Sequence, residues 1–198
     1  LAWHRAKKEM HNMRVFINPG HAPNGNPDPG AVNANTGLRE CDVALVVGTK
    51  VAAYLETAGC ETKVLQSDSL DEICEAANSW PADTFVSIHC NSAVSEEANG
   101  FEVWTSPGQT AGDDLATCIY QQIMDQFPDR LGRSDYSDGD ADKEARFYVL
   151  VHTDAPACLV EMAFISNDEE AALLADHDWQ DTYARAIARG VTDYGKEG

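Results

Sequence analysis

Short apolar segments and amphipathic segments alternate along this chain of 198 residues. The apolar segments are bounded by turn-forming residues and are rich in β-branched and aromatic side chains, which is typical of strands. We therefore expect strands at residues 15–18, 62–66, 84–91, 101–105, 147–151 and 158–164.

Between these strands, apolar side chains recur every three or four residues, which is the spacing of one helix face. This spacing predicts a helix over residues 39–58, which Gly59 would end. The same pattern predicts helices over 69–79, along 115–127, and from 179 to 194 near the C-terminus. Loops are expected at 19–38 and 128–145, where Gly, Pro, Asn and charged residues gather.

Strands that alternate with helices form mainly parallel sheets covered on both faces. We expect an α/β fold: a mainly parallel, twisted central sheet of about six strands with helices on both faces. The length suits one domain with a sizeable core. We assign residues 13–195 to this domain, 1–12 to an N-terminal extension or a remnant of an expression vector, and 196–198 to the start of a linker.

Ionisable side chains accompany three of the apolar strands. His21 follows the first strand after a Pro-Gly break, His89 lies in the third strand, and Glu161 lies in the last. An unpaired buried charge is costly, so these residues call for a functional explanation. Ligands of such sheets gather at the carboxyl ends of the strands. We therefore expect these side chains to form one polar site at that edge.

Two imidazoles and a carboxylate suit a hydrolytic zinc site, which uses three protein ligands and keeps one position for water. His21 and His89 supply the imidazoles. Glu40, in the first turn of its helix, and Glu161 are the two candidate carboxylates. One glutamate would bind the metal and the other would take a proton from water. Spacing alone does not say which is which. His152, after the strand at 147–151, is a weaker candidate for the cleft.

Composition excludes several classes of function. The net charge of −19 and the isoelectric point near 4.4 argue against binding to nucleic-acid phosphates. No apolar run approaches the roughly 20 residues that span a bilayer, and residues 1–12 are too polar and basic for a signal peptide. The six cysteines include no C-x-x-C pair, so we expect mostly reduced thiols.

Seven motifs occur in the order of a known family. They are INPGH at 17–21, DPGA at 28–31, GLRE at 37–40, AAN at 76–78, ADTFVSIHCN at 82–91, GFEV at 100–103 and APACLVEMAFISN at 155–167. In these motifs, over roughly residues 13–194, the chain resembles the zinc-dependent N-acetylmuramoyl-L-alanine amidases of amidase type 3. The resemblance implies that His21, Glu40 and His89 bind Zn²⁺ and that Glu161 is the catalytic glutamate.

The resemblance also implies a substrate and a reaction: hydrolysis of the amide between the lactyl group of muramic acid and the first L-alanine of the stem peptide in peptidoglycan. The chain departs from the family pattern at a few positions. Asn18 stands where the family usually has Asp, Gln66 and the acidic segment 71–75 stand where arginine is often found, and Val151-His152 replaces another arginine. These differences concern substrate details and leave the zinc set intact.

Two other functions share these residues. A zinc peptidase or deacetylase would use the same site to hydrolyse a different amide. A catalytically inactive module would bind the cell wall without hydrolysing it. An amidase of this type is expected to act at the cell wall, as a secreted autolysin or as an endolysin released by lysis. Its partner would be peptidoglycan, with targeting by a separate wall-binding domain of the parent protein.

Overall fold

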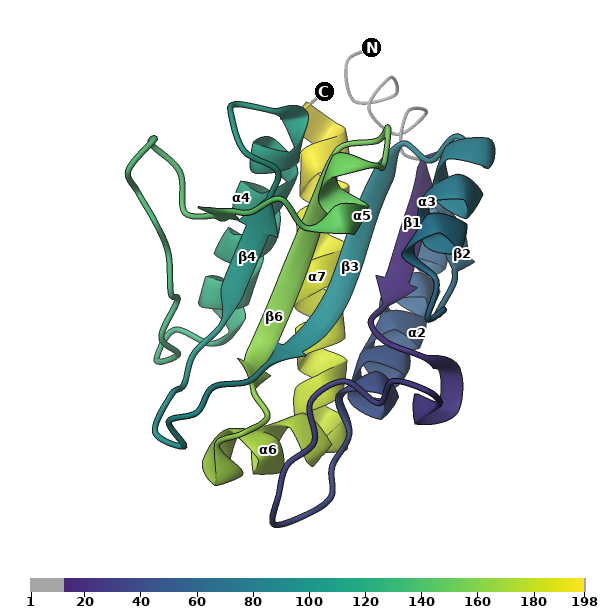
Figure 1. Ribbon diagram of the computed structural model, residues 1–198. Coiled ribbons are helices and arrows are strands. Elements are labelled where there is room, and N and C mark those ends of the chain that lie inside the picture. Colours follow the sequence, from purple (N-terminus) through teal and green to yellow (C-terminus); the bar gives the residue numbers. More distant parts are fainter. Residues whose placement is uncertain (1–12, 198) are drawn as a thin grey trace.

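The computed structural model describes residues 13–197 and shows one six-stranded sheet flanked by helices on both faces (Figure 1). The sheet order is β2-β1-β3-β6-β4-β5. The strands are β1 (Arg14–Pro19), β2 (Glu61–Val64), β3 (Thr84–Asn91), β4 (Glu102–Thr105), β5 (Lys143–Glu144) and β6 (Ala157–Phe164). Among these six described strands, only the β4–β6 pairing is antiparallel. The predicted α/β class with a mainly parallel sheet is confirmed.

Helices cover the two faces of the sheet unequally. The helices are η1 (Pro23–Gly25), α2 (Glu40–Ala58), α3 (Leu70–Ser79), α4 (Ala111–Gln126), α5 (Tyr148–Val151), α6 (Asp168–Ala175) and α7 (His177–Glu197). The long helices α2, α4 and α7 pack on one face over the larger apolar cluster, and α3 and α5 cover part of the other face (Figure 1). None of the described helices is long and apolar enough to cross a bilayer.

The central strands β1 and β3 are buried on both faces of the sheet. Ile17 and Val86 point into the larger cluster, whereas Phe16 and Phe85 stack in the smaller one with ring centroids 5.6 Å apart. This alternation fixes the register of β1 against β3. Both strands therefore end at the same edge of the sheet, and the residues that follow them are held close together.

The strand predicted at 147–151 is wrong, because most of that segment is the short helix α5. Leu150 and Val151 donate backbone hydrogen bonds to Phe147 over 3.0 and 3.2 Å, which closes a helical turn. Val149 and Leu150 bury their side chains against the face of the sheet. A short apolar run has the same composition in a buried strand and in a buried helical turn, so periodicity does not separate them. The two-residue strand β5, within the loop predicted at 128–145, completes the sheet instead.

Two further differences concern the ends of the domain. Helix α6 was not predicted; it begins where Asn167 accepts hydrogen bonds from the backbone N–H groups of Glu169 and Glu170, a standard N-terminal cap. Helix α7 extends to Glu197. The predicted extension at 1–12 lies outside the described residues, and the domain boundaries stay predictions.

The packing of α7 on α4 generates a test of the fold. A Cβ atom added to Gly190 would lie only 2.7 Å from the backbone nitrogen of Ile119, so Gly190→Ala would force the two helices apart. We expect it to lower the free energy of unfolding by about 1–3 kcal/mol, the usual range for overpacking. Gly195→Ala in the same helix is the control, because its Cβ would meet only the flexible end of Met13. Chemical denaturation measures both, and equal stability of the two variants would contradict this account.

Candidate metal centre

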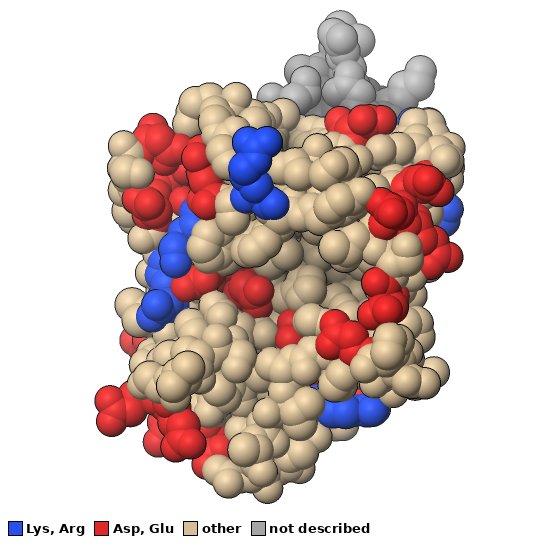
Figure 2. Space-filling view, in the orientation of Figure 1, with Lys and Arg blue, Asp and Glu red and all other residues tan. Residues whose placement is uncertain are grey.

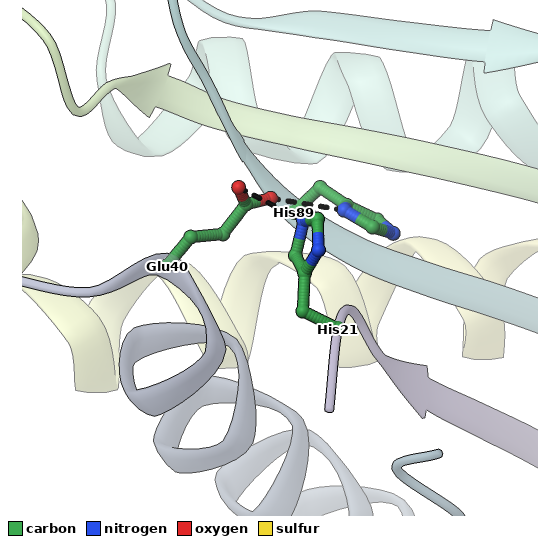
Figure 3. A group of neighbouring side chains, drawn as sticks. All are labelled: His21, Glu40 and His89. Atoms are coloured by element: carbon green, nitrogen blue, oxygen red, sulfur yellow. Dashed lines mark hydrogen bonds and ion pairs between the residues drawn. The ribbon is translucent and has the colours of Figure 1, made fainter. Parts of the chain in front are cut away.

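Three side chains from three different elements converge at the carboxyl edge of the sheet (Figure 3). His21 follows β1, Glu40 begins α2, and His89 lies near the end of β3. Their candidate ligand atoms all lie within 4.8 Å of one another. Glu40 lies between the two imidazoles, with its Oε2 2.9 Å from His21 Nε2 and its Oε1 2.9 Å from His89 Nδ1. The predicted grouping of these three residues is therefore present.

Two glycines and an unusual backbone conformation allow these three side chains to come together. A Cβ atom on Gly20 would overlap the His89 ring, and one on Gly30 would overlap both His21 and Glu40. His21 itself has a φ of 66°, in the left-handed region that side chains other than Gly rarely adopt. Such strain persists only where the surroundings over-determine it, and it is concentrated at functional sites.

Glu40 is held as a carboxylate by four donors. The backbone N–H of Cys90 donates to Oε1, and that of Ala31 donates to Oε2, both over 2.9 Å. The two histidines complete the set. The residue is 4% exposed, and its position in the first turn of α2 adds the favourable field of the helix N-terminus.

The pKa values reflect this mutual stabilisation. Burial acts to raise the pKa of Glu40, but the hydrogen bonds from His21 and His89 outweigh it and hold the pKa well below its ordinary value. Burial acts to lower the pKa of His21, but Glu40 and Asp28 outweigh it and raise the pKa to about 9. The Glu40 and Asp28 carboxylates therefore stabilise positive charge next to them.

Asp28 was not predicted as a site residue, although it contacts one directly. Its Oδ2 accepts a hydrogen bond from His21 Nδ1 over 2.7 Å, and its Oδ1 accepts one from the backbone of Gly30 over 2.9 Å. This contact leaves Nε2 of His21 facing Glu40. A carboxylate behind the imidazole commonly orients metal-binding histidines. The only signal in the sequence was the DPGA motif, which does not reveal the contact.

The donor set fits a metal ion. Two imidazole nitrogens and one carboxylate oxygen are ligands of borderline-soft divalent ions. Glu40 and His89 lie in a helix and a strand, His21 lies two residues after β1, and neighbouring backbone and side-chain groups fix their orientation. His21, Glu40 and His89 could therefore hold a metal ion at the strand ends, whereas Glu161 lies outside this group of three.

Glu161 nevertheless lines the same cleft in the protein surface as His21, Glu40 and His89. It lies on β6 directly opposite His89 in the strand register. Its Oε2 is buried and has no hydrogen-bond partner among the described residues. Burial raises the pKa of Glu161 to about 7, an effect that His89 partly opposes and that Glu40 and Glu102 reinforce. A carboxyl group with this pKa can both take up and release a proton near neutral pH.

The cleft around these groups has a volume of about 510 Å³ and is lined on one side by apolar residues. Those residues are Leu70, Ile73, Phe147, Val149 and Leu159. Figure 2 shows the hollow in the middle of this face, with acidic groups at several points of its margin. His152 does not line the cleft; its ring stacks on Tyr148 at 3.9 Å between centroids. Its suggested role in the cleft is therefore wrong.

A second buried carboxylate, Glu102, was also missed by sequence reasoning. It lies opposite Glu161 in the β4–β6 register. Its Oε1 accepts hydrogen bonds from Arg133 over 2.8 Å and Lys143 over 3.0 Å, which outweigh the effect of burial and lower its pKa. Both cations lie in the charged segment 128–145, which was predicted to be a loop, so only the GFEV motif could have drawn attention to Glu102.

Comparisons with known proteins agree on one family. The family model of amidase type 3, described as N-acetylmuramoyl-L-alanine amidase, matches residues 15–193. The chain is 33% identical over 184 residues to the amidase LytC of Bacillus subtilis, covering 91% of this chain but only 35% of LytC. It is 35% identical over 185 residues to the amidase CwlM of Bacillus licheniformis, covering 90% of this chain and 67% of CwlM.

A solved structure gives the same result. The amidase AmiC2 of Nostoc punctiforme superposes with a TM-score of 0.80 at 33% identity, covering 92% of this chain and 96% of that one. The match to the family model extends from β1 into α7. It therefore includes His21, Glu40, His89 and Glu161. The chain belongs to the amidase type 3 family of N-acetylmuramoyl-L-alanine amidases.

Proposed function

We propose that this protein is a zinc-dependent peptidoglycan hydrolase that cleaves the amide between N-acetylmuramic acid and the L-alanine of the stem peptide. One observation carries the proposal. His21, Glu40 and His89 converge beside Glu161, a buried carboxyl group with an unpartnered oxygen, in a cleft open to substrate. Membership of the amidase family supports the choice of amide.

Zinc suits the donor set, because catalytic zinc takes three protein ligands and leaves a position for water or substrate. His21, Glu40 and His89 would be those three ligands, as the family resemblance implies. When bound there, zinc would lower the pKa of water and polarise the amide carbonyl. Asp28 would keep His21 in the tautomer whose Nε2 is free to bind.

Glu161 would act as general base and then as general acid. Its carboxylate would take a proton from water as the oxygen attacks the amide carbon, and would pass a proton to the leaving nitrogen. Burial raises the pKa of this carboxyl group, which makes it a better proton acceptor than an exposed glutamate. The products are a free lactyl carboxylate and a peptide with a free L-alanine amino group, so the atoms of water are accounted for.

The apolar wall of the cleft gives the substrate a surface beside the reacting groups. Leu70, Ile73 and Leu159 lie along it. A peptide that packs there would position its amide by contacts remote from the reaction, which reduces the entropic part of the barrier. The same site could hydrolyse another amide as a zinc peptidase or deacetylase. The inactive wall-binding module is disfavoured, because all four polar groups are present.

Product analysis separates these functions. Purified peptidoglycan treated with the protein should release new L-alanine amino termini without new reducing sugar ends. Cleavage within the stem peptide would identify a peptidase, and released acetate would identify a deacetylase. No new end group of any kind would favour the inactive module.

The first prediction concerns the metal. The purified protein should hold one zinc per chain, and His89→Ala should lose most of it because one of three ligands is gone. His177→Ala is the matched control, since His177 contacts Gln180 on α7 and lies outside the cleft. Elemental analysis after dialysis measures zinc in all three proteins, and equal zinc content would refute the ligand assignment.

The second prediction concerns Glu161. Glu161→Gln preserves shape and removes the proton acceptor, so we expect normal zinc content and a loss of turnover of about 10²–10⁴-fold, the usual contribution of a general base. Glu169→Gln, an exposed change on α6, should leave turnover unchanged. Loss of zinc in Glu161→Gln would make this residue a ligand, and near-normal turnover would remove it from the mechanism.

The third prediction concerns targeting. Residues 13–198 carry a net charge of −21, since Arg5, Lys7, Lys8 and Glu9 contribute +2 to the total of −19. Such a surface offers no long-range attraction to anionic wall polymers. We propose that targeting comes from a separate wall-binding domain and that the enzyme acts at the cell wall. In a pull-down on insoluble peptidoglycan, the Glu161→Gln variant of this chain should stay in solution; strong retention that resists salt would place a wall-binding surface within the chain.

A further inference from the structure

The side-chain amide of Gln66 contacts the backbone at both sides of the metal centre. Its Nε2 donates one hydrogen bond to the carbonyl of Gly20 over 3.0 Å and another to the carbonyl of Cys41 over 2.9 Å. Gly20 directly precedes His21, and Cys41 directly follows Glu40. A primary amide has two N–H donors, so Gln66 uses both of them to join the residue before His21 to the residue after Glu40.

The same hydrogen-bonded chain continues to the third ligand. The backbone N–H of Gly20 donates to the carbonyl of Ile88 over 2.9 Å, and Ile88 directly precedes His89. The residues next to all three proposed ligands are therefore linked by hydrogen bonds, from Ile88 through Gly20 and the amide of Gln66 to Cys41. Gln66 is the only side chain in this series.

Gln66 is itself held in position by its neighbours. The segment that follows β2 continues beside β1, with the backbone N–H of Leu65 donating to Ile17 over 3.1 Å. The side chain of Asn18 donates to the carbonyl of Leu65 over 3.1 Å, and its oxygen accepts from the Ser87 hydroxyl over 2.8 Å. The amide therefore extends from a fixed backbone toward two fixed carbonyls.

Glu40 also contacts His21 directly, side chain to side chain over 2.9 Å, but its remaining contacts do not join the backbone near Glu40 to the backbone near His21. Ala31 and Cys90 bind the Glu40 carboxylate, and the N–H of Cys41 bonds to Pro29 in the loop between β1 and α2. That loop spans many residues, so it constrains the separation of β1 and α2 only indirectly. We infer that Gln66 is a positioning residue of the metal centre, which fixes the backbone of His21 relative to that of Glu40.

This inference rests on the proposed zinc site. The test distinguishes a failure of the zinc site from a failure of the role of Gln66. Gln66→Met has similar length and no donors, and Gln66→Glu has the same shape with acceptors in place of the amide donors. Partners that orient metal ligands usually contribute about 10–100-fold to metal affinity. We therefore expect both variants to bind zinc at least about tenfold more weakly in competition with a chelator. The added charge of Gln66→Glu would by itself attract zinc, so a loss in both variants identifies geometry as the cause.

A cobalt spectrum supplies a readout that a purely structural role would not change. Co²⁺ bound to the wild-type protein should give visible bands that are shifted or weakened in both variants, because these bands report the arrangement of the ligands. Gln122→Met is the matched control, since that amide bonds to Asp193 between α4 and α7. Its zinc affinity and cobalt spectrum should equal those of the wild type.

The outcomes are distinct. A wild-type protein that binds no zinc contradicts the proposed function. A wild-type protein that binds zinc, with unchanged affinity and cobalt spectrum in the Gln66 variants, overturns the positioning role even if their melting temperature falls. Should Gln66→Met not fold, Gln66→Asn serves in its place, because its shorter amide does not reach both carbonyls. The same loss of affinity is expected from it.

Discussion

The structure of the site depends on one interaction, the burial of the Glu40 carboxylate between two imidazoles. A buried carboxylate is unfavourable unless donors replace the water it loses. Here two backbone N–H groups and two histidines replace it, and all four donors come from segments that the sheet brings together. Removing any one segment would leave a buried charge short of a partner, so this group of side chains depends on the folding of the sheet edge.

That dependence explains the unusual backbone around the site. Three elements must approach until their side chains touch, and the space left between them admits no Cβ at Gly20 or Gly30. The left-handed φ of His21 turns its ring back toward Glu40. The hydrogen bond from His21 to Asp28 and the close packing offset this strain. Neighbouring groups thus fix the three side chains, which would reduce the reorganisation that metal binding requires.

The sequence predicted the sheet and the grouping of His21, Glu40 and His89 because both follow from local patterns. Apolar runs gave the central strands, and residues next to their carboxyl ends had to meet at one edge. The pattern did not separate a strand from a helical turn at 147–151, since burial of Val149 and Leu150 is equally compatible with both. It also could not show Asp28, Gln66 or Glu102 in their roles, because each acts through a contact with a residue distant in the chain. Polar residues in loops carry no periodic signal that would reveal such contacts.

The two glutamates left open by spacing differ in their surroundings, and this difference suits them to different tasks. Glu40 is surrounded by donors that hold its pKa well below the ordinary value, so it remains charged and is a poor proton acceptor. Glu161 is half-buried, its Oε2 is buried with no hydrogen-bond partner among the described residues, and burial raises its pKa to about 7. Environments that push the pKa values of two neighbouring carboxyl groups apart commonly divide them between charge stabilisation and proton transfer. On this physical ground Glu40 suits the ligand and Glu161 the base, which is also the division that the family resemblance implies.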